Sequence, residues 1–97
     1  MGERQTPEAR AHTQRKANLK HRFGMTLEEY DELFEAQNGG CAICGGSNAS
    51  GRRLAVDHDH ETGTVRGLLC FECNVGLGKF KDDVTIVRRA TRYLGGE

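Results

Sequence analysis

Apolar residues in the first half of the chain are spaced as on one face of a helix. They follow an i, i+3, i+4, i+7 pattern, which predicts an amphipathic helix that packs against a core. Thr26 and Glu29 form a capping-box pattern at its start, and Asn38-Gly39-Gly40 is typical of a helix end. The apolar stripe consists of Leu27, Tyr30, Leu33, Phe34 and, at its end, Gln37.

The segment before this helix lacks such a stripe. Thr6-Pro7-Glu8 combines a hydroxyl cap, a proline at the first helical position and an acid in the first turn. We expect a helix from there to about His21, ended by Gly24. A helix that is polar nearly all round packs weakly and is often an arm that meets a partner. Its basic residues are Arg10, Arg15, Lys16 and Lys20.

The middle of the chain has the signals of a β-hairpin. We expect a short strand over 54–58, a turn at Glu61-Thr62-Gly63 and a return strand over 64–69. Side chains alternate across a strand, so a fully extended strand would direct His58 and His60 to one side and the intervening acids to the other. A break in the strand near residue 58 would instead let Asp57 and His58 converge.

Two further helices complete the predicted order. One runs from Cys70 to about Lys79, and Asp82-Asp83 begins a last helix that ends at Gly95-Gly96. Helix, helix, cysteine pair, hairpin, helix, helix is an α+β arrangement. We expect one compact domain with three parts: an N-terminal helical arm and lead-in helix (1–40), a metal-bracketed core (41–80) and a C-terminal helix (81–97).

Cysteine spacing indicates how so small a domain is held together. The chain has 97 residues, 36% hydrophobic content and no tryptophan, so it cannot bury a large core and a structural metal is the expected staple. Two C-x-x-C pairs predict a tetrahedral zinc site that is closed to water. The alternatives are two disulfides, or a histidine in place of one cysteine. The paired residues are Cys41 with Cys44 and Cys70 with Cys73.

Charge is segregated although the formal net charge is zero. Residues 1–23 hold six basic residues against two acidic ones, and residues 74–97 hold five against three. Residues 24–40 hold five acids and no base. Basic ends favour a phosphate-bearing partner. We expect no membrane span and no secretory signal, which favours zinc thiolates in a reducing cytosol over disulfides.

Between and after the cysteine pairs lie residues suited to a second, hard metal. Asp57 and Asn74 offer the oxygen ligands that magnesium or manganese prefers. A neutral imidazole from His58 nearby suits a general base that deprotonates water. Each residue also has a structural interpretation: an acid capping a turn, a histidine in packing, or an asparagine bonded to backbone or thiolate. The combination inside a zinc frame favours catalysis.

These stretches resemble the HNH, or ββα-metal, nucleases with a treble-clef-like core, and more narrowly the recombination endonuclease VII family of phages. The resemblance covers roughly residues 20–94. It is carried by Arg22 to Tyr30, by Cys41-Ala42-Ile43-Cys44, by Leu54 to His60, and by Gly63 to Asn74 with its R-G-L-L-C-x-x-C-N run.

The resemblance implies a metal-dependent DNA endonuclease with separate roles for its residues. Cys41, Cys44, Cys70 and Cys73 would bind structural zinc, and Asp57 and Asn74 would hold one magnesium or manganese ion. His58 would be the general base and His60 would contact the phosphate, leaving a 5′ phosphate. The backbone of DNA would be positioned by Arg66, Arg15, Lys16, Lys20, Arg22, Lys79 and Lys81.

One departure and one alternative accompany this interpretation. The family has an acid three positions beyond the ligating asparagine, where this chain has Leu77. The C-terminal part through which endonuclease VII dimerises is not expected here, so nicking or double-strand cleavage of low sequence specificity, by a monomer, is expected rather than junction resolution.

We expect a phage or prophage protein of the bacterial cytoplasm, with packaging or recombination proteins as partners. The alternative is a non-catalytic zinc module that binds DNA or protein.

Overall fold

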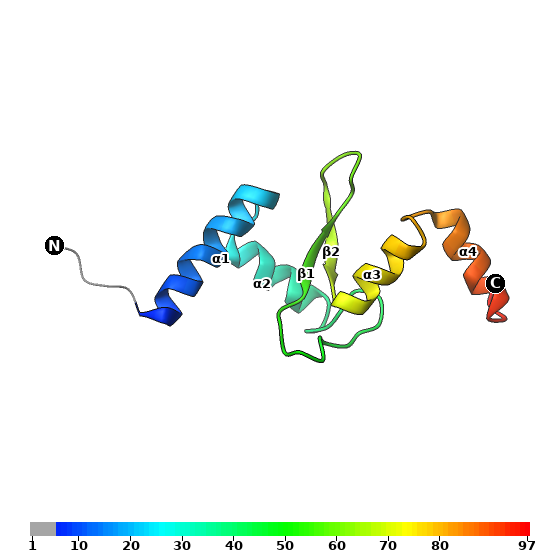
Figure 1. The fold of residues 1–97 in the computed structure, drawn as a ribbon, viewed down its shortest axis with the longest axis horizontal. Helices are drawn as coiled ribbons and strands as arrows, with labels where there is room; N and C mark the ends of the chain where they lie inside the picture. The colour runs from blue at the N-terminus through cyan, green and yellow to red at the C-terminus, as the bar shows by residue number, and fades with distance from the viewer. Residues whose placement is uncertain (1–5) are drawn as a thin grey trace.

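The computed structural model describes residues 6–97 and has an elongated shape, with extents of 63 × 29 × 23 Å. The two-stranded hairpin lies at the centre, with two helices before it and two after it in the chain (Figure 1). The α+β class is confirmed. Arg4, part of the basic N-terminal segment, lies outside the described residues. The elements are α1 (Pro7–Phe23), α2 (Leu27–Ala36), β1 (Ala55–His58), β2 (Val65–Leu69), α3 (Phe71–Lys79) and α4 (Val84–Tyr93).

The first two helices begin where their capping residues predict. The Thr6 hydroxyl accepts a hydrogen bond from the Ala9 amide at 3.1 Å. Thr26 and Glu29 exchange the two bonds of a capping box, at 3.0 and 3.2 Å. Between the helices, Gly24 adopts the left-handed conformation (φ 62°) that a glycine reaches at little cost. These local signals were sufficient to define both helix starts.

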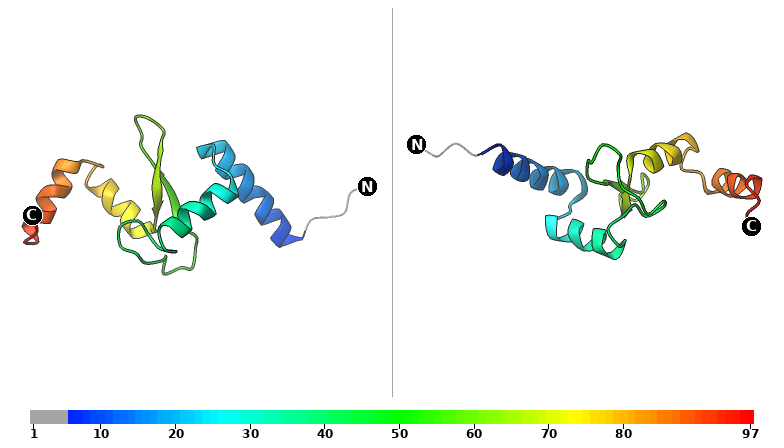
Figure 2. Two further views of the ribbon diagram at one scale, coloured as in Figure 1. Left: turned by 180° about the vertical axis from the view of Figure 1, so that it is seen from behind. Right: turned by 90° about the horizontal axis from the view of Figure 1, so that it is seen from below.

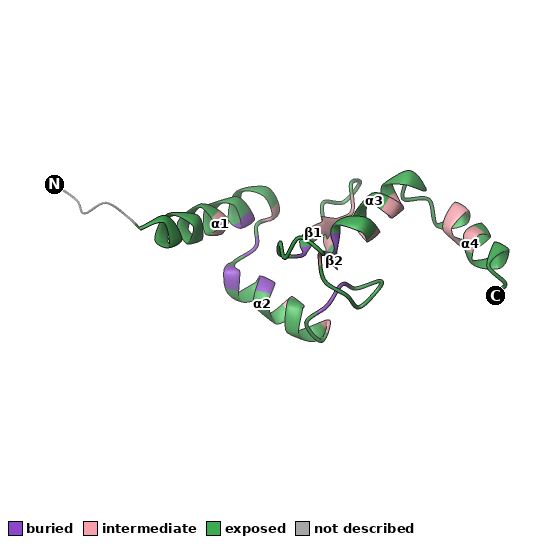
Figure 3. Cartoon of the chain, turned by 60° about the horizontal axis from the view of Figure 1, so that its bottom comes forward, coloured by how far each residue is buried: buried purple, intermediate pink, exposed green. Residues whose placement is uncertain are grey.

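Burial is concentrated where α1, α2, the hairpin and the first cysteine pair meet. Leu68 is fully buried at its centre, whereas α1 buries only Leu19 and α4 buries no residue. Figure 3 shows this contrast: α1 and α4 are almost wholly exposed, and the buried residues lie between them. The buried set is Leu19, Met25, Leu27, Tyr30, Cys41, Leu54, Leu68, Leu69 and Cys70.

Polar links fasten α2 to the hairpin. The Gln37 amide nitrogen donates to the carbonyls of Gly40 (2.8 Å) and Leu68 (3.0 Å), and its oxygen accepts from the Leu68 amide (2.9 Å). The Tyr30 hydroxyl donates to the Leu54 carbonyl, just before β1. A Cβ at Gly67 would lie 3.1 Å from the Gln37 oxygen, so a larger residue there would have to displace Gln37 slightly. Gln37, the residue that follows α2, thus links this helix to β2 through its side-chain amide.

The hairpin contains an irregularity beside the predicted catalytic residues. Asp57 pairs with Gly67, but His58 pairs with Val65, so Arg66 is the extra residue of a bulge. A bulge bends the strand and redirects side chains. The sequence left open a break in the first strand near residue 58; β1 instead continues through His58, and the irregularity lies on the partner strand at Arg66.

The two C-terminal helices are joined by a sharp reversal. Lys81 and Asp82 both have positive φ, 59° and 52°. The next residue, Asp83, caps α4 by accepting from the amides of Thr85 (2.8 Å) and Ile86 (3.4 Å). Figure 2 shows α4 at one end of the molecule and α1 at the other. None of the helices in the described range is long and apolar enough to cross a membrane.

Candidate functional site

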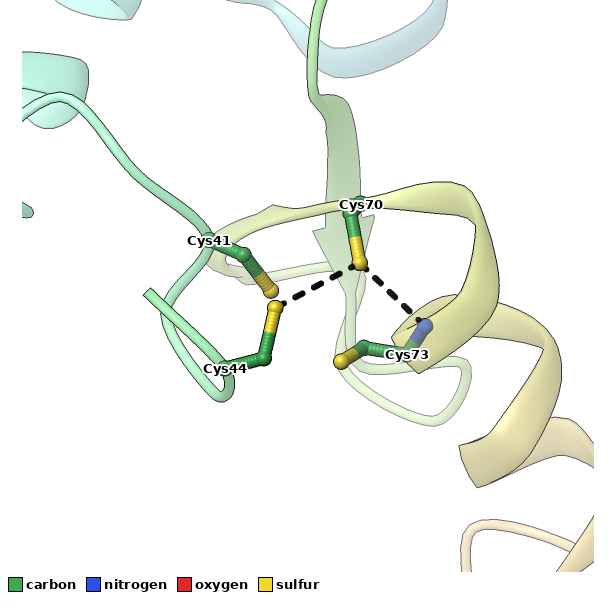
Figure 4. Close-up of side chains that lie close together, drawn as sticks. All are labelled: Cys41, Cys44, Cys70 and Cys73. Carbon is green, nitrogen blue, oxygen red and sulfur yellow. Dashed lines mark hydrogen bonds between the residues drawn. The ribbon is translucent and has the colours of Figure 1, made fainter. Parts of the chain in front are cut away.

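The four cysteines converge into one cluster. Their sulfur atoms all lie within 4.8 Å of one another, and the Cys44 and Cys70 sulfurs are 3.7 Å apart (Figure 4). A zinc ion with Zn–S bonds of about 2.3 Å would separate its thiolates by about 3.8 Å in tetrahedral geometry. All four cysteines are free of disulfide bonds, and no histidine is part of the group. The sequence prediction of one four-cysteine metal site is supported over both alternatives.

Backbone amides surround these sulfurs. The amides of Ile43 and Gly46 donate to the sulfurs of Cys41 (3.4 Å) and Cys44 (3.3 Å). The Cys73 amide donates to the Cys70 sulfur at 3.4 Å. Burial opposes ionisation of Cys41, but bonding to the backbone of Cys70, Cys44 and Ile43 outweighs it and lowers its pKa to about 6. Thiolates are the form that binds metal, so the backbone favours ligation.

The cluster is built into the core. The Ala42 amide donates to the Leu68 carbonyl of β2 at 3.0 Å, and Cys70 is the N-cap of α3. At Gly40, any side chain would collide with the Gly45 carbonyl of the knuckle, the turn at 41–46 that carries the first cysteine pair. Cys41 and Cys70 are only 3% and 5% exposed. The cluster therefore fixes the hairpin, the knuckle and the start of α3 relative to one another.

Beside this frame lies a cleft of about 610 Å³ that holds several predicted site residues. It is lined by Asp57, Asp59, His60, Glu61, Arg66, Asn74, Gly78, Lys81 and Asp82. Asp57 comes from β1 and Asn74 from α3, so the hairpin and the helix each contribute one predicted metal ligand to the lining of the cleft. Asn74 follows Cys73 directly, and its backbone N–H donates to the Cys70 carbonyl at 3.0 Å. The thiol cluster thus sets the position of Asn74.

Asp57 is held by an arginine rather than exposed to water. Arg66 donates from Nε and Nη2 to the two carboxylate oxygens, at 2.8 and 3.2 Å. The same Nη2 donates to Asp82 at 3.2 Å. Bonding to Asp57 raises the pKa of the Arg66 guanidinium, with burial opposing it. The cleft therefore contains a carboxylate–guanidinium–carboxylate bridge centred on Arg66.

The two histidines of the run are in contact but differ in surroundings. Their ring centroids are 4.9 Å apart, and the His58 ring is 5.5 Å from that of Phe23 in α1. His60 lines the cleft and lies 3.9 Å from Asp82, with a side chain 75% exposed. His58 is half-buried behind it and is not among the residues that line the cleft. The structure therefore places His60 in the cleft and His58 beside it, in contact with His60 and Phe23.

Asp59 and Leu77, near the predicted catalytic residues in sequence, have structural roles. The Asp59 carboxylate accepts from the amides of Glu61 (2.8 Å) and Thr62 (3.2 Å), which lowers its pKa and organises the hairpin turn. Leu77 packs against the core and does not line the cleft. An acid at position 77 would face apolar neighbours here. Asp82, at the far end of α3, supplies a carboxylate to the cleft instead.

The predicted DNA-contacting residues divide into three groups. Arg66 and Lys81 line the cleft. Arg15 and Arg22 line a separate groove, where the Arg15 guanidinium stacks 4.7 Å above the Tyr30 ring. The others are exposed and line neither space: Lys16, Lys20 and Lys79.

Sequence reasoning missed three contributions. Asp82 read only as a helix start, because nothing local shows that the left-handed reversal turns it toward Arg66. Asn48, within a polar loop, bonds to the carbonyls of Arg52 (2.9 Å) and Arg53 (3.0 Å) and to the Phe71 amide (2.6 Å). The adjacent Arg52 and Arg53 were a signal that could have been used, since paired arginines in a polar loop favour phosphate.

Comparison with known proteins gives a family match. The family described as recombination endonuclease VII matches residues 16–96. The Gene 59 protein of Mycobacterium phage D29 is 45% identical over 87 residues, covering 89% of this chain and 53% of the phage protein. The Gene 59 protein of Mycobacterium phage L5 is 44% identical over the same extent. The chain thus spans about half the length of these curated relatives. No solved structure matches it significantly.

Proposed function

Because the chain belongs to the recombination endonuclease VII family, we propose that it is an HNH-type, metal-dependent DNA endonuclease that hydrolyses phosphodiester bonds and leaves 5′ phosphates. The observation that carries the proposal is the meeting of Asp57 and Asn74 in one cleft beside the cysteine cluster. The family supplies the class of reaction, and the cleft supplies residues able to perform it.

The proposed metals differ in their fit to the residues present. Zinc suits Cys41, Cys44, Cys70 and Cys73, whose sulfur spacing matches a tetrahedral thiolate site. Four protein ligands leave no open position, so its role is structural. Asp57 and Asn74 offer oxygen atoms suited to magnesium or manganese, with water completing the coordination. The guanidinium of Arg66 now occupies that carboxylate, so a cation and Arg66 compete for Asp57.

The side chains of the cleft divide the chemistry among them. A bound divalent ion would supply Lewis-acid stabilisation of the developing charge on the phosphate and leaving oxygen. His58, beside the cleft and in contact with His60, takes a proton from the attacking water as general base. His60, exposed at the cleft, donates to a phosphate oxygen. Arg66, once released by Asp57, can bind phosphate bidentately through its guanidinium.

A non-catalytic zinc module is the competing function. The observation in its favour is that Arg66 already neutralises Asp57, as a purely structural ion pair would. The Arg66 side chain is 39% exposed and the Asp57 side chain 14%, so solvent screens the pair only partly, and its contribution to stability lies at the upper end of about 0–1 kcal/mol. A weak pair can open when a cation or phosphate arrives, which is compatible with catalysis.

Nicking of supercoiled plasmid by zinc-loaded protein tests the proposal. We expect conversion to open circles with magnesium or manganese and none without a divalent ion. A linear and a branched DNA run beside it would define the preferred form. Protein that carries zinc and binds the plasmid, yet cuts nothing with either metal, would establish the non-catalytic module instead.

A further inference from the structure

A second groove, larger than the cleft, is not used by the proposed chemistry. It has a volume of about 1140 Å³ and lies between α1, the 47–56 segment and the start of α3. Four arginines line it against a single acid, Glu72. The arginines come from two separate parts of the chain: Arg15 and Arg22 from α1, and Arg52 and Arg53 from the loop before β1. Such convergence gives the groove a positive potential.

These arginines are not neutralised within the described residues. Among the described residues, Arg22, Arg52 and Arg53 have no carboxylate within 4.0 Å. The terminal Nη2 of Arg15 is buried without a hydrogen-bond partner while its guanidinium lies over Tyr30. A buried donor without a partner is costly, and it keeps this guanidinium short of hydrogen bonds at the wall of the groove.

The loop arginines are also held in place. Asn48 donates from Nδ2 to the carbonyls of Arg52 and Arg53, and its oxygen accepts from the Phe71 amide at the start of α3. One side chain thereby ties the backbone of both arginines to the helix that carries Asn74. A preorganised pair loses less entropy on binding than a mobile one.

The groove and the cleft meet at Asn74, which lines both. We propose that the groove holds the phosphate backbone of duplex DNA on one side of the bond to be cut, with Arg22, Arg52 and Arg53 contacting successive phosphates. The strand then continues past Asn74 into the cleft. This inference rests on the proposed function, and it assigns to Arg52 and Arg53 a positioning role with no part in bond cleavage.

Salt dependence of DNA binding tests the inference separately from cutting. Fluorescence anisotropy on a short labelled duplex, with zinc-loaded protein and no added magnesium or manganese, gives Kd between about 50 and 200 mM salt. We expect the paired substitution Arg52→Ala/Arg53→Ala to weaken binding and to reduce the slope of log Kd against log salt by about 2. The single substitution Arg22→Ala, on α1, should reduce it by about 1.

Matched variants distinguish a groove from general charge. Arg88→Ala/Arg89→Ala removes two exposed charges from α4, which lines neither space, and should leave the slope unchanged. Arg52→Lys/Arg53→Lys should retain it. Equal slope losses for the α4 and loop pairs, or no loss for the loop pair and Arg22→Ala, would overturn the inference. If the variants change the slope as predicted but the wild-type protein never cuts DNA, the proposed nuclease activity is refuted and the proposed role of the groove in DNA binding stands.

Discussion

The cysteine cluster and the cleft share the hairpin and α3, yet they are built in opposite ways. The cluster gathers four cysteine side chains, two of them nearly inaccessible to solvent. Backbone amides donate hydrogen bonds to three of its sulfurs. The cleft gathers carboxylates, histidine, amide and guanidinium, most of them reachable from solvent. A closed site of uniform ligands holds a fold, whereas an open site of mixed groups can admit substrate. Each prediction below probes that contrast.

Loss of a buried thiol should have the largest effect. Cys70→Ser removes a core thiolate ligand while serine can still cap α3, so the chain should fail to retain zinc and should lose its cooperative thermal transition. Zinc sites in small domains supply apparent folding energies on the order of 10 kcal/mol. Circular dichroism with zinc analysis checks this. A Cys70→Ser protein that melts like the parent would show that the cluster does not hold the fold.

Loss of the His58 imidazole should spare the fold and slow cutting strongly. His58→Ala should reduce the nicking rate by about 10²–10⁴-fold, the usual contribution of a general base, with zinc content unchanged. His60→Ala is the matched control, because the two rings are in contact and only His60 lines the cleft. A smaller loss for His58→Ala than for His60→Ala would reassign the base to His60.

Asn48 links the loop to the frame that both sites share. Asn48→Ala removes three hydrogen bonds and leaves the Phe71 amide without its partner. We expect a loss of about 1–3 kcal/mol in the free energy of unfolding, with the zinc retained. Urea denaturation measures it. Unchanged stability would mean that the loop is not anchored as described.

Arg66 should have the smallest effect on stability and a selective effect on the cleft. Arg66→Ala removes exposed ion pairs worth about 0–1 kcal/mol in total. It also frees the Asp57 carboxylate, so manganese should bind more tightly, as measured by electron paramagnetic resonance. Asp82→Asn keeps the Arg66–Asp57 pair and should change manganese affinity less. Weaker manganese binding by Arg66→Ala would contradict competition for Asp57.

Local signals predicted the elements well because each depends on neighbouring residues. The caps at Thr6, Thr26 and Asp83 each define a helix start that the structure confirms. The C-x-x-C spacing likewise predicted a cluster that forms as expected.

Long-range pairing could not be obtained in this way. The bridge from Arg66 to Asp57 and Asp82 depends on a strand bulge and on a left-handed reversal after α3, and neither has a local glycine or proline signal at the residue concerned. Position 77 is of interest only because the family has an acid there; in the structure Leu77 packs against the core, and the acids that line the cleft are Asp57, Asp59, Glu61 and Asp82.

The separation of tasks between cluster and cleft is tested most directly at Asn74, which lies next to a cysteine of the cluster and lines the cleft. The measurement is the plasmid-nicking rate of Asn74→Ala per zinc-loaded molecule. We predict one zinc per chain and a rate lower by roughly 100-fold, equivalent to about 3 kcal/mol of transition-state stabilisation. A rate like that of the parent, or loss of zinc together with activity, would contradict the account.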